Sequence, residues 1–377
     1  FADDLPAAGA KASAPAQPDA VSSGLVPLAE ADAWDRIVKR CLHWDVYHLA
    51  AYHRVAAVTD GGEPFLFWFE ADGATACVPF LRRPIDPSLA GDRARFDASS
   101  AYGYPGPIAS CSEAPNATWR GALQDHFRKA LSDAGIVAAF IRHESRAADI
   151  WLVDGLGETL EAGPTVMLDL AGSDEDRAAR LGQKHRYEVR RAERDGLRVV
   201  EASEDEDYEA FAGLYGATME RLGATAYYRF PLDYFFKLRD ALGDHLRLLF
   251  TVDASGERLA GALFFLTPGI VQYHLSGRKA GPEATFAMRP LLDAGAKLGA
   301  GQGARWMHLG GGLGGRQDGL FAFKASVTGG RSRFLTTRWI VDPAGYAAIC
   351  ERAVRIRGGA GDPSFFPAYR APVRKDP

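Results

Sequence analysis

The chain has 377 residues, a length that suggests two domains of ordinary size. Its 47% hydrophobic and 24% charged residues are typical of a globular protein, and its formal net charge is -4 at pH 7. This balance excludes a global basic field that would draw the protein onto nucleic acid or an anionic membrane, so any such contact needs a local patch. We expect no membrane span, because no apolar run approaches the roughly 20 residues that a membrane helix needs.

The cysteines and the first residues bear on the compartment. Four cysteines stand far apart, without a CxxC pair or a Cys/His spacing typical of zinc sites, so we expect free thiols and no metal. Residues 1–24 are rich in Ala and Pro and lack periodicity, which predicts a disordered tail. They also lack the basic start and apolar core of a signal peptide. These features together favour a cytoplasmic protein.

The first half of the chain alternates helix and strand patterns, as in an α/β unit. We expect this unit to form an N-terminal domain over residues 25–160. Its predicted elements are a helix at 30–40, a hairpin of strands at 65–70 and 75–80, a Gly/Pro-rich loop at 102–107, an amphipathic helix at 117–134 and a buried strand at 136–142.

The second half shows the same kind of alternation, so the predicted fold class is α/β, with mixed sheets, for both halves. A C-terminal domain is expected at 161–345, followed by a C-terminal helix and tail at 346–377. The predicted helices of this domain are 174–195 (which Gly196 ends), 205–222, 231–242, 286–300 and 319–326, and the predicted strands are 165–170, 197–201, 246–252, 259–266, 270–276, 306–309 and 333–341.

A local basic cluster occurs at residues 181–199, LGQKHRYEVRRAERDGLRV, in an otherwise acidic chain. Arg186, Arg190 and Arg194 are four residues apart and share one face of the expected helix. Two interpretations stay open from the residues alone. The cluster is a solvated face paired with neighbouring glutamates, or Lys184 and the arginines contact a phosphate-bearing partner, with tRNA as a candidate.

Two segments near the ends of predicted strands carry polar groups or glycines. Tyr273 and His274 can donate and accept protons, although half-buried packing is the more common role of such residues in a strand. The run HLGGGLGG at 308–315 satisfies GxGxxG, but no helix pattern begins in it. We therefore expect a turn whose backbone, at Gly310 and Gly311, approaches a substrate, rather than a dinucleotide site.

Phe323 and Lys324 follow the glycine run directly. An ammonium group there could neutralise a developing oxyanion or a phosphate. The alternative is a lysine that extends to solvent from an amphipathic helix. The sequence contains no GxSxG, Walker A or HExxH motif that would indicate another chemistry.

Taken together, these segments resemble the FemA/FemB/FemX family of the GNAT acyltransferase superfamily, in order and spacing, over residues 165–330. Residues 45–53 and 102–107 are similar, more loosely, to bacterial GNAT or BioF2-like acetyltransferases. The matching residues are KHRxxxRRAxxxG at 184–196, Thr218, Arg221, Tyr228, Phe230, Phe235, Phe236, AGALF at 260–264, YHLSG at 273–277, HLGGG at 308–312 and Phe323-Lys324.

The resemblance implies two tandem GNAT-like domains and an enzyme that moves an acyl or aminoacyl group to an amine. The donor would be aminoacyl-tRNA or acyl-CoA, acting as a co-substrate, with no tightly bound cofactor. The acceptor in the best-known members is a peptidoglycan precursor, and a sugar or metabolite stays open for this chain, as does its oligomeric state.

The resemblance also implies roles for individual residues. Phe323 and Lys324 match the family's catalytic centre, where the lysine stabilises charge at the attacked carbonyl. From their chemistry, rather than from the resemblance, Tyr273 or His274 could assist proton removal from the amine. Substrate-binding candidates are Thr218, Arg221, Tyr228, Gly310 and Gly311, with Lys184, Arg186 and Arg190 as phosphate contacts.

Two departures from the family pattern leave the donor open. No long charged arm is inserted between the halves, unlike in the staphylococcal members. Residues 278–283 approach the pyrophosphate loop of CoA-dependent GNAT enzymes but end in Glu283, whose carboxylate would repel a pyrophosphate. The alternative function is a non-catalytic binding module for a nucleotide-linked sugar or a protein, which predicts that Phe323 and Lys324 lie away from any pocket.

Overall fold

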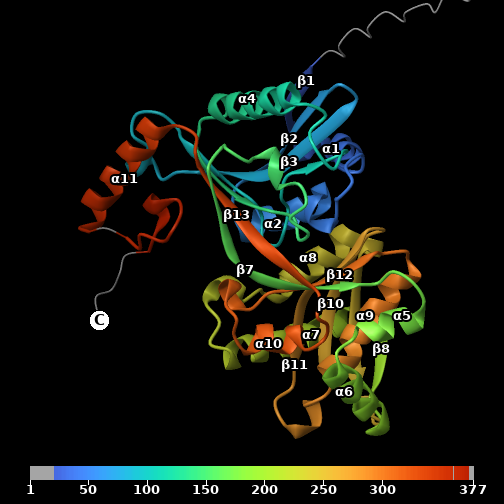
Figure 1. Cartoon of the computed structure of the whole chain (residues 1–377). Helices are drawn as coiled ribbons and strands as arrows, with labels where there is room; N and C mark the ends of the chain where they lie inside the picture. The colour runs from blue at the N-terminus through green and yellow to red at the C-terminus, as the bar shows by residue number, and fades with distance from the viewer. Residues whose placement is uncertain (1–20, 360, 373–377) are drawn as a thin grey trace, which may run out of the picture.

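The computed structural model describes residues 21–359 and 361–372, and one continuous 13-stranded sheet runs through both halves (Figure 1). The spatial order is β1-β2-β3-β4-β6-β13-β7-β12-β11-β10-β9-β8, and β5 pairs with β3 outside this path. Neighbours are antiparallel except in the pairs β4–β6 and β11–β12. The strands are β1 (Ser22–Pro27), β2 (Glu63–Ala71), β3 (Ala74–Pro84), β4 (Phe96–Ser99), β5 (Ile108–Ala109), β6 (Ile136–Arg142), β7 (Glu158–Asp169), β8 (Arg198–Ala202), β9 (Leu246–Val252), β10 (Arg258–Leu266), β11 (Ile270–Arg278), β12 (Trp306–Gly310) and β13 (Arg331–Ile340).

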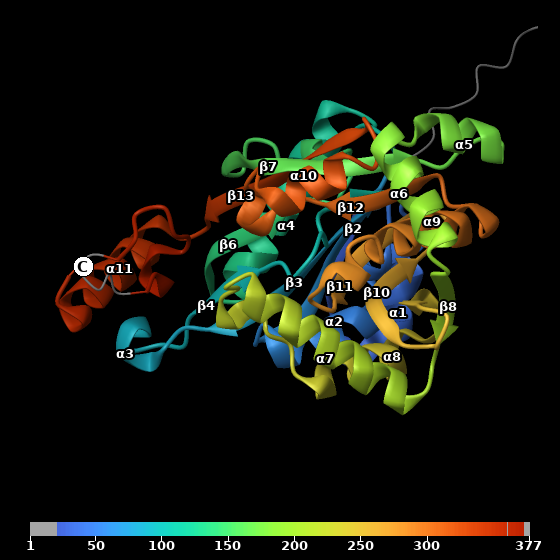
Figure 2. The ribbon, with the colours of Figure 1, turned by 90° about the horizontal axis from the view of Figure 1, so that it is seen from below.

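Helices cover both faces of this sheet (Figure 2). Short 3-10 turns connect several of the elements. The helices are α1 (Ala31–Val38), α2 (Ala50–Thr59), α3 (Pro87–Ala90), α4 (Ala117–Asp133), α5 (Asp174–Arg180), α6 (Gln183–Arg194), α7 (Asp205–Arg221), α8 (Leu232–Leu242), α9 (Met288–Gly301), α10 (Gly319–Ala325) and α11 (Pro343–Arg357).

Side-chain alternation along β2 divides the core of the N-terminal half into two layers. Phe67 and Phe69 pack against Trp119 and Phe127 of α4. Leu66, which points to the other face of the strand, belongs to a separate cluster with α1. The sheet in this half is therefore buried between α4 on one face and α1 with the start of α2 on the other.

The same alternation organises the C-terminal half. Phe264 of β10 packs in a cluster with α9, whereas Phe265 faces α7 and α8. The cluster around Phe265 also contains two residues of the N-terminal half: Tyr47, which precedes α2, and Tyr52, which belongs to it. One apolar core is thus shared by both halves, on the face that carries α2, α7 and α8.

Two long strands join the halves within the sheet. β13, from near the end of the chain, pairs with β6 through Thr336↔Arg142 and with β7 through Arg331↔Val166. β7 also pairs with β12, so it continues the sheet into the C-terminal half. Figure 1 shows both strands running from the upper to the lower half. The predicted domain boundaries stay a prediction: residue 160 falls within β7 and residue 345 within α11.

The prediction of one helix over 174–195 is wrong, because the chain breaks between α5 and α6. Leu181 forms an isolated bridge with Thr328, and the Gly182 amide donates to the Val327 carbonyl at 2.7 Å. A Cβ at Gly182 would lie 2.4 Å from the carbonyl oxygen of Ser326. The segment after α10 therefore packs onto the backbone at this point and interrupts the helix.

The predicted disordered tail over 1–24 is also wrong where the structure describes it. Residues 22–24 belong to β1, which pairs with β2 through Ser22↔Glu70 and Gly24↔Trp68. Ser and Gly have low strand propensity, and the strand forms because β2 supplies a complete backbone partner. Residues 1–20 of the predicted tail lie outside the described residues.

Candidate active site

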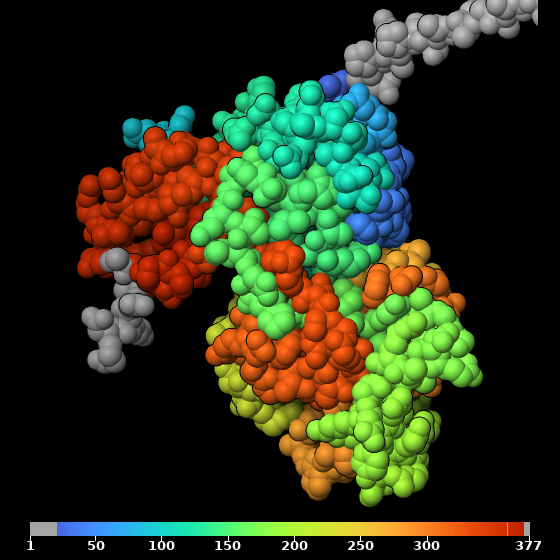
Figure 3. Space-filling model, viewed as in Figure 1, coloured from blue at the N-terminus to red at the C-terminus, as the bar shows by residue number. Residues whose placement is uncertain are grey.

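A cavity of about 710 Å³ has walls from both halves of the chain. Ligand pockets in proteins commonly fall in this range of volume. Figure 3 shows the orange-red segment that contains α10 on the front of the lower half, beneath the green and teal upper half. The residues around the cavity include Tyr47, Tyr102, Tyr104 and Arg142 from the N-terminal half, and Thr218, Tyr228, Tyr273, His274, Arg278, Gly310, Gly311, Arg316, Asp318, Phe323 and Lys324 from the C-terminal half.

Lys324 is a buried cation in the wall of this cavity. Its helix, α10, is capped by Asp318, whose side chain accepts a hydrogen bond from the Phe321 amide at 2.9 Å. The Lys324 Nζ donates to the Gly311 carbonyl at 2.8 Å and forms no ion pair within residues 21–359 and 361–372. Burial lowers the pKa of Lys324 to about 8, while Asp318 raises it. The ammonium is therefore largely protonated at neutral pH and keeps donors for a ligand.

Phe323, beside Lys324, is held by a buried arginine on α9. The guanidinium of Arg289 lies 4.3 Å from the centre of the Phe323 ring, and its Nη2 donates to Ser326 Oγ at 2.8 Å. The Nε of Arg289 donates to Glu188 of α6 at 2.5 Å. The position of α10 thus depends on an ion pair between α6 and α9.

Tyr273 and His274 are neighbours on β11, so they point to opposite faces of the sheet. The Tyr273 hydroxyl donates to Ser276 Oγ, and burial raises its pKa to about 12. The Lys324 Nζ lies 5.8 Å from the centre of the Tyr273 ring. Tyr273 therefore lies close to the lysine, but its proton is firmly held.

His274 is hydrogen-bonded at both ring nitrogens. Its Nδ1 lies 3.0 Å from the Tyr47 hydroxyl, and its Nε2 lies 3.2 Å from the Tyr234 hydroxyl. Burial lowers its pKa to about 3, so the ring is neutral at physiological pH. Its part in proton removal stays a prediction, and this geometry favours a fixed hydrogen-bonding role.

Three of the predicted substrate-binding residues divide between the cavity and its surroundings. Thr218 and Tyr228 line the cavity. Arg221 is not among the lining residues; its Nη2 donates to Thr218 Oγ1 at 2.9 Å and to the Arg278 carbonyl at 2.7 Å. The Arg221 guanidinium therefore supports the end of β11, and its predicted contact with substrate is not at the cavity wall.

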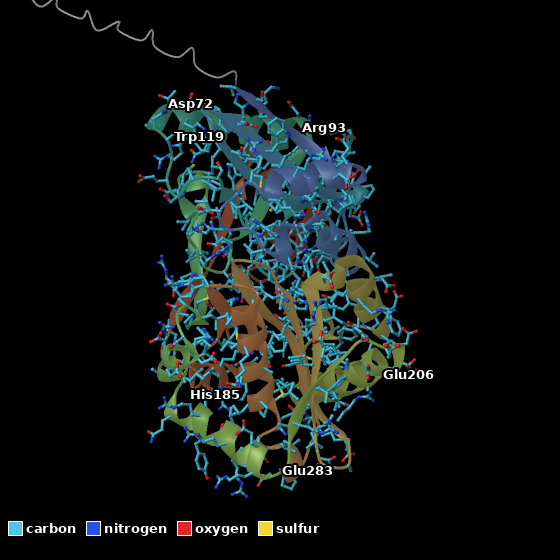
Figure 4. The ribbon with its side chains drawn as sticks, turned by 90° about the vertical axis from the view of Figure 1, so that its right-hand side faces the viewer. Asp72, Arg93, Trp119, His185, Glu206 and Glu283 are labelled. Carbon is cyan, nitrogen blue, oxygen red and sulfur yellow. The ribbon has the colours of Figure 1, made fainter. Side chains whose placement is uncertain are left out.

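The basic residues of α6 lie apart from the cavity lining. Lys184 and Arg190 are exposed, and Arg186 is half-buried, with its Nη1 donating to the Ala178 carbonyl at 2.9 Å. Figure 4 shows His185 of the same helix in the lower half of the molecule, far from Trp119 of the upper half. The structure does not bring these cations together with Lys324, and their phosphate contacts stay a prediction.

The glycine run approaches Lys324 from β12. Gly310 has a φ of +73°, in the left-handed region that favours glycine. The run then forms a 3-10 turn at Leu313–Gly315, and α10 begins only at residue 319. No helix starts within the run, so the geometry of a dinucleotide phosphate site is absent from this part of the described chain. Gly311 contributes its carbonyl, which holds the lysine.

The sequence reasoning missed the cavity residues of the N-terminal half, Tyr104 and Arg142 among them. Tyr104 comes from the YGYPGP loop, and Arg142 ends the apolar strand β6. Arg142 makes no ion pair within the part of the chain that the structure describes, and its buried Nε has no hydrogen-bond partner there. The available signal for Arg142 was a charged residue at the end of an apolar run. Only the fold shows that Arg142 and Lys324 line the same cavity.

Comparisons with known proteins agree with this architecture. The FemAB family model matches residues 153–255, from just before β7 to just after β9. No curated protein matches the chain. The structure of FemX aligns with a TM-score of 0.66 at 16% identity, covering 86% of this chain and 99% of FemX. A conserved protein of unknown function from Bacteroides thetaiotaomicron VPI-5482 aligns with a TM-score of 0.52 at 12% identity, covering 83% of this chain and 97% of that protein. The structure of L-PGS from Bacillus licheniformis aligns with a TM-score of 0.48 at 14% identity, covering 82% of this chain and 91% of L-PGS.

The first two structures share their fold with most of this chain. They confirm the predicted α/β fold. The FemAB match confirms the expected resemblance over residues 153–255.

Two further observations concern metals and membranes. Within the described residues, no three His, Cys, Asp or Glu side chains gather in a way that could hold a metal ion. None of the helices in residues 21–359 and 361–372 combines the length and apolar character that crossing a bilayer requires.

Proposed function

We propose that this chain forms an amide by transferring an acyl or aminoacyl group from an activated donor to an amine bound in the cavity between its halves. The observation that carries the proposal is Lys324, a buried ammonium in the cavity wall with no carboxylate paired to it in the described chain. Burying an ammonium there costs free energy unless a negatively charged group interacts with it. A carbonyl that becomes an oxyanion supplies that negative charge during the reaction.

The chemistry asks little of the protein beyond positioning and charge stabilisation. The amine nitrogen attacks the donor carbonyl, and the C–N bond forms as the carbonyl oxygen becomes negative. The C–O bond of an ester, or the C–S bond of a thioester, then breaks. One proton leaves the amine and one reaches the departing oxygen or sulfur. Lys324 stabilises the oxyanion throughout, and Phe323, clamped by Arg289, holds the lysine's helix in place.

The charges around the cavity suit an anionic substrate. Arg142, Arg278, Arg316 and Lys324 line it, against the single carboxylate of Asp318. Asp318 is engaged in capping α10. The surplus of positive charge favours a donor or acceptor that carries phosphate or carboxylate groups.

Aminoacyl-tRNA is the donor that we place first, and acyl-CoA second. The resemblance to the FemA/FemB/FemX proteins points to tRNA and to a cell-wall precursor as acceptor. Glu283, whose charge opposes a pyrophosphate, lies at the lower end of the molecule in Figure 4. A sugar or metabolite amine is the second class of acceptor.

The alternative function, a non-catalytic binding module, predicts that Phe323 and Lys324 are buried away from any pocket. Both residues line the cavity instead. This arrangement favours catalysis, and we do not pursue the alternative.

The experiment that tests the proposal offers two labelled donors in parallel to the purified protein and a small-molecule extract. One reaction receives radiolabelled aminoacyl-tRNA and the other radiolabelled acetyl-CoA. Amide products are distinguished from unreacted ester by their resistance to mild base. Label in an amide from tRNA alone supports an aminoacyltransferase, and label from CoA alone makes the chain an acyl-CoA enzyme. An absence of amide product from both donors, with bacterial cell-wall precursors added, would contradict the proposal.

A further inference from the structure

Two hydrogen-bond donors from opposite halves of the chain converge on Gly310. A heavy atom placed at the Cβ position of this glycine would lie 3.3 Å from the Lys324 Nζ and 3.6 Å from the Tyr104 hydroxyl oxygen. No other heavy atom outside the glycine and its chain neighbours comes within 4 Å of that point. Both groups line the cavity. The ammonium and the phenol therefore both approach the cavity wall at Gly310.

The Tyr104 ring is held by aromatic packing on both sides. It lies edge-on to His308, with ring centres 4.5 Å apart, and edge-on to Phe334, with centres 5.3 Å apart. Rings packed in this way have little freedom to reorient. The direction of the hydroxyl is thus set by the core rather than by a hydrogen bond of its own.

His308 is in turn fixed by a buried polar chain that crosses between the halves. Its Nδ1 lies 2.7 Å from Gln272 Oε1, and Gln272 Nε2 donates to Asp45 Oδ2 at 2.7 Å and to Ser145 Oγ at 3.0 Å. All four side chains are buried. Hydrogen bonds between buried groups favour one arrangement of their members, so the His308 ring beside Tyr104 is fixed through its Nδ1 atom.

The protonation states suit Tyr104 to donating a hydrogen bond. Burial raises the pKa of Tyr104 to about 12, so the phenol keeps its proton across the physiological range. Burial also lowers the pKa of His308 to about 3, which leaves that ring neutral. Within the described residues, the Tyr104 hydroxyl has no hydrogen-bond partner. Its proton is therefore available to a ligand in the cavity.

We infer that Tyr104 is a second catalytic residue, whose O–H donates to the same carbonyl oxygen that Lys324 stabilises. The inference rests on the proposed function and adds to it a group supplied by the N-terminal half. No proton is transferred by Tyr104: its hydrogen bond shortens as charge builds on the oxygen and relaxes when the leaving group departs. Two preorganised donors at one developing oxyanion form an oxyanion hole.

Tyr104→Phe removes the hydroxyl and keeps the ring that packs on His308 and Phe334. We expect kcat to fall by about 10²-fold, as when one donor of an oxyanion hole is lost, with KM for the donor nearly unchanged. The matched control is Tyr208→Phe, which removes the hydroxyl of another buried tyrosine that does not line the cavity. This control should keep wild-type turnover.

A second readout separates catalysis from a structural effect. Slow hydrolysis of the donor by water passes through the same oxyanion but uses no amine. Tyr104→Phe should therefore slow hydrolysis and transfer by the same factor. If Tyr104→Phe slows transfer but not hydrolysis, Tyr104 positions the acceptor instead. If Tyr104→Phe turns over as fast as Tyr208→Phe, Tyr104 has no role in the reaction. Either result overturns the inference. A wild-type protein that neither transfers nor hydrolyses the donor would instead remove the proposed function itself.

Discussion

At the scale of single residues, the central feature is the Lys324 ammonium, which lies in the cavity wall without a paired carboxylate in the described chain. Lys324 loses hydration there, which is why its pKa falls to about 8 from its ordinary 10.5. Asp318, at the start of the same helix, raises that pKa. Lys324 is therefore a cation at neutral pH and loses its charge in mild alkali.

This titration predicts the alkaline limb of the pH–rate profile. Lys324 acts as a cation, so its contribution is complete only well below pH 8 and is lost as pH rises through the folded pKa. We expect kcat/KM to decline above about pH 8. Asp318→Asn keeps a good helix cap but removes the charge that supports the ammonium, so this variant should shift the limb to lower pH. A profile without any limb below pH 10, or an unshifted limb in the variant, would contradict the assignment.

Several of these residues could be found from the sequence, because they lie in short recognisable segments. Phe323, Lys324, Tyr273 and His274 were predicted as a group, and all four line the cavity. Tyr104 could not be found in this way, since its relation to Lys324 depends on the pairing of distant strands. Their chemical roles stay predictions until they are measured.

At the scale of elements, the Glu188–Arg289 ion pair links the basic helix α6 to α9, whose Arg289 also contacts Phe323 beside Lys324. Arg289 is 3% exposed, so its charge depends on this partner. Removing one member of a buried pair leaves the other uncompensated, which is more costly than replacing both. The pair therefore positions α10 as well as stabilising the C-terminal half.

Glu188→Gln should lower the free energy of unfolding by about 3 kcal/mol, because Arg289 would stay buried without its counter-charge. The double variant Glu188→Gln/Arg289→Met should be less destabilised than this single variant. Urea denaturation of both variants checks the order, with Glu193→Gln, at an exposed position on the same helix, as control. A double variant less stable than the single one would show that the charge pair is not the reason for the coupling.

Sequence patterns predicted elements well where an apolar run or an apolar stripe is clear and poorly elsewhere. β6 was predicted at its observed bounds, and α4 within one residue. α2 was missed because Ala50, Tyr52, His53, Val55 and Ala56 are buried around most of the helix, which leaves no clear apolar stripe. The break between α5 and α6 arises from a contact distant in sequence, which local patterns do not report.

At the scale of the whole molecule, the two halves share a sheet and an apolar core. β13 fills the position between β6 and β7, so residues near the end of the chain complete the sheet of the first half. No periodicity in the sequence indicates that placement. The cavity exists only when both halves are assembled, since Arg142 and Tyr104 come from one and Lys324 from the other.

The shared sheet predicts that both halves unfold together. Thermal unfolding followed by tryptophan fluorescence and by far-ultraviolet circular dichroism should give coincident single transitions. A variant truncated after residue 330, which lacks β13, should lose the fold of both halves. Two separated transitions, or a truncated chain with a folded N-terminal half, would show that the halves are independent.

The central claim is tested most directly by the turnover of Lys324→Met per folded molecule, with the donor that the wild-type protein uses. Methionine fills similar space without a charge, so the account predicts a loss of kcat of about 10²-fold or more. The free energy of unfolding at pH 7 should stay constant or rise by about 1–3 kcal/mol, because a buried unpaired charge has been removed. Wild-type turnover in a folded Lys324→Met protein would contradict the account.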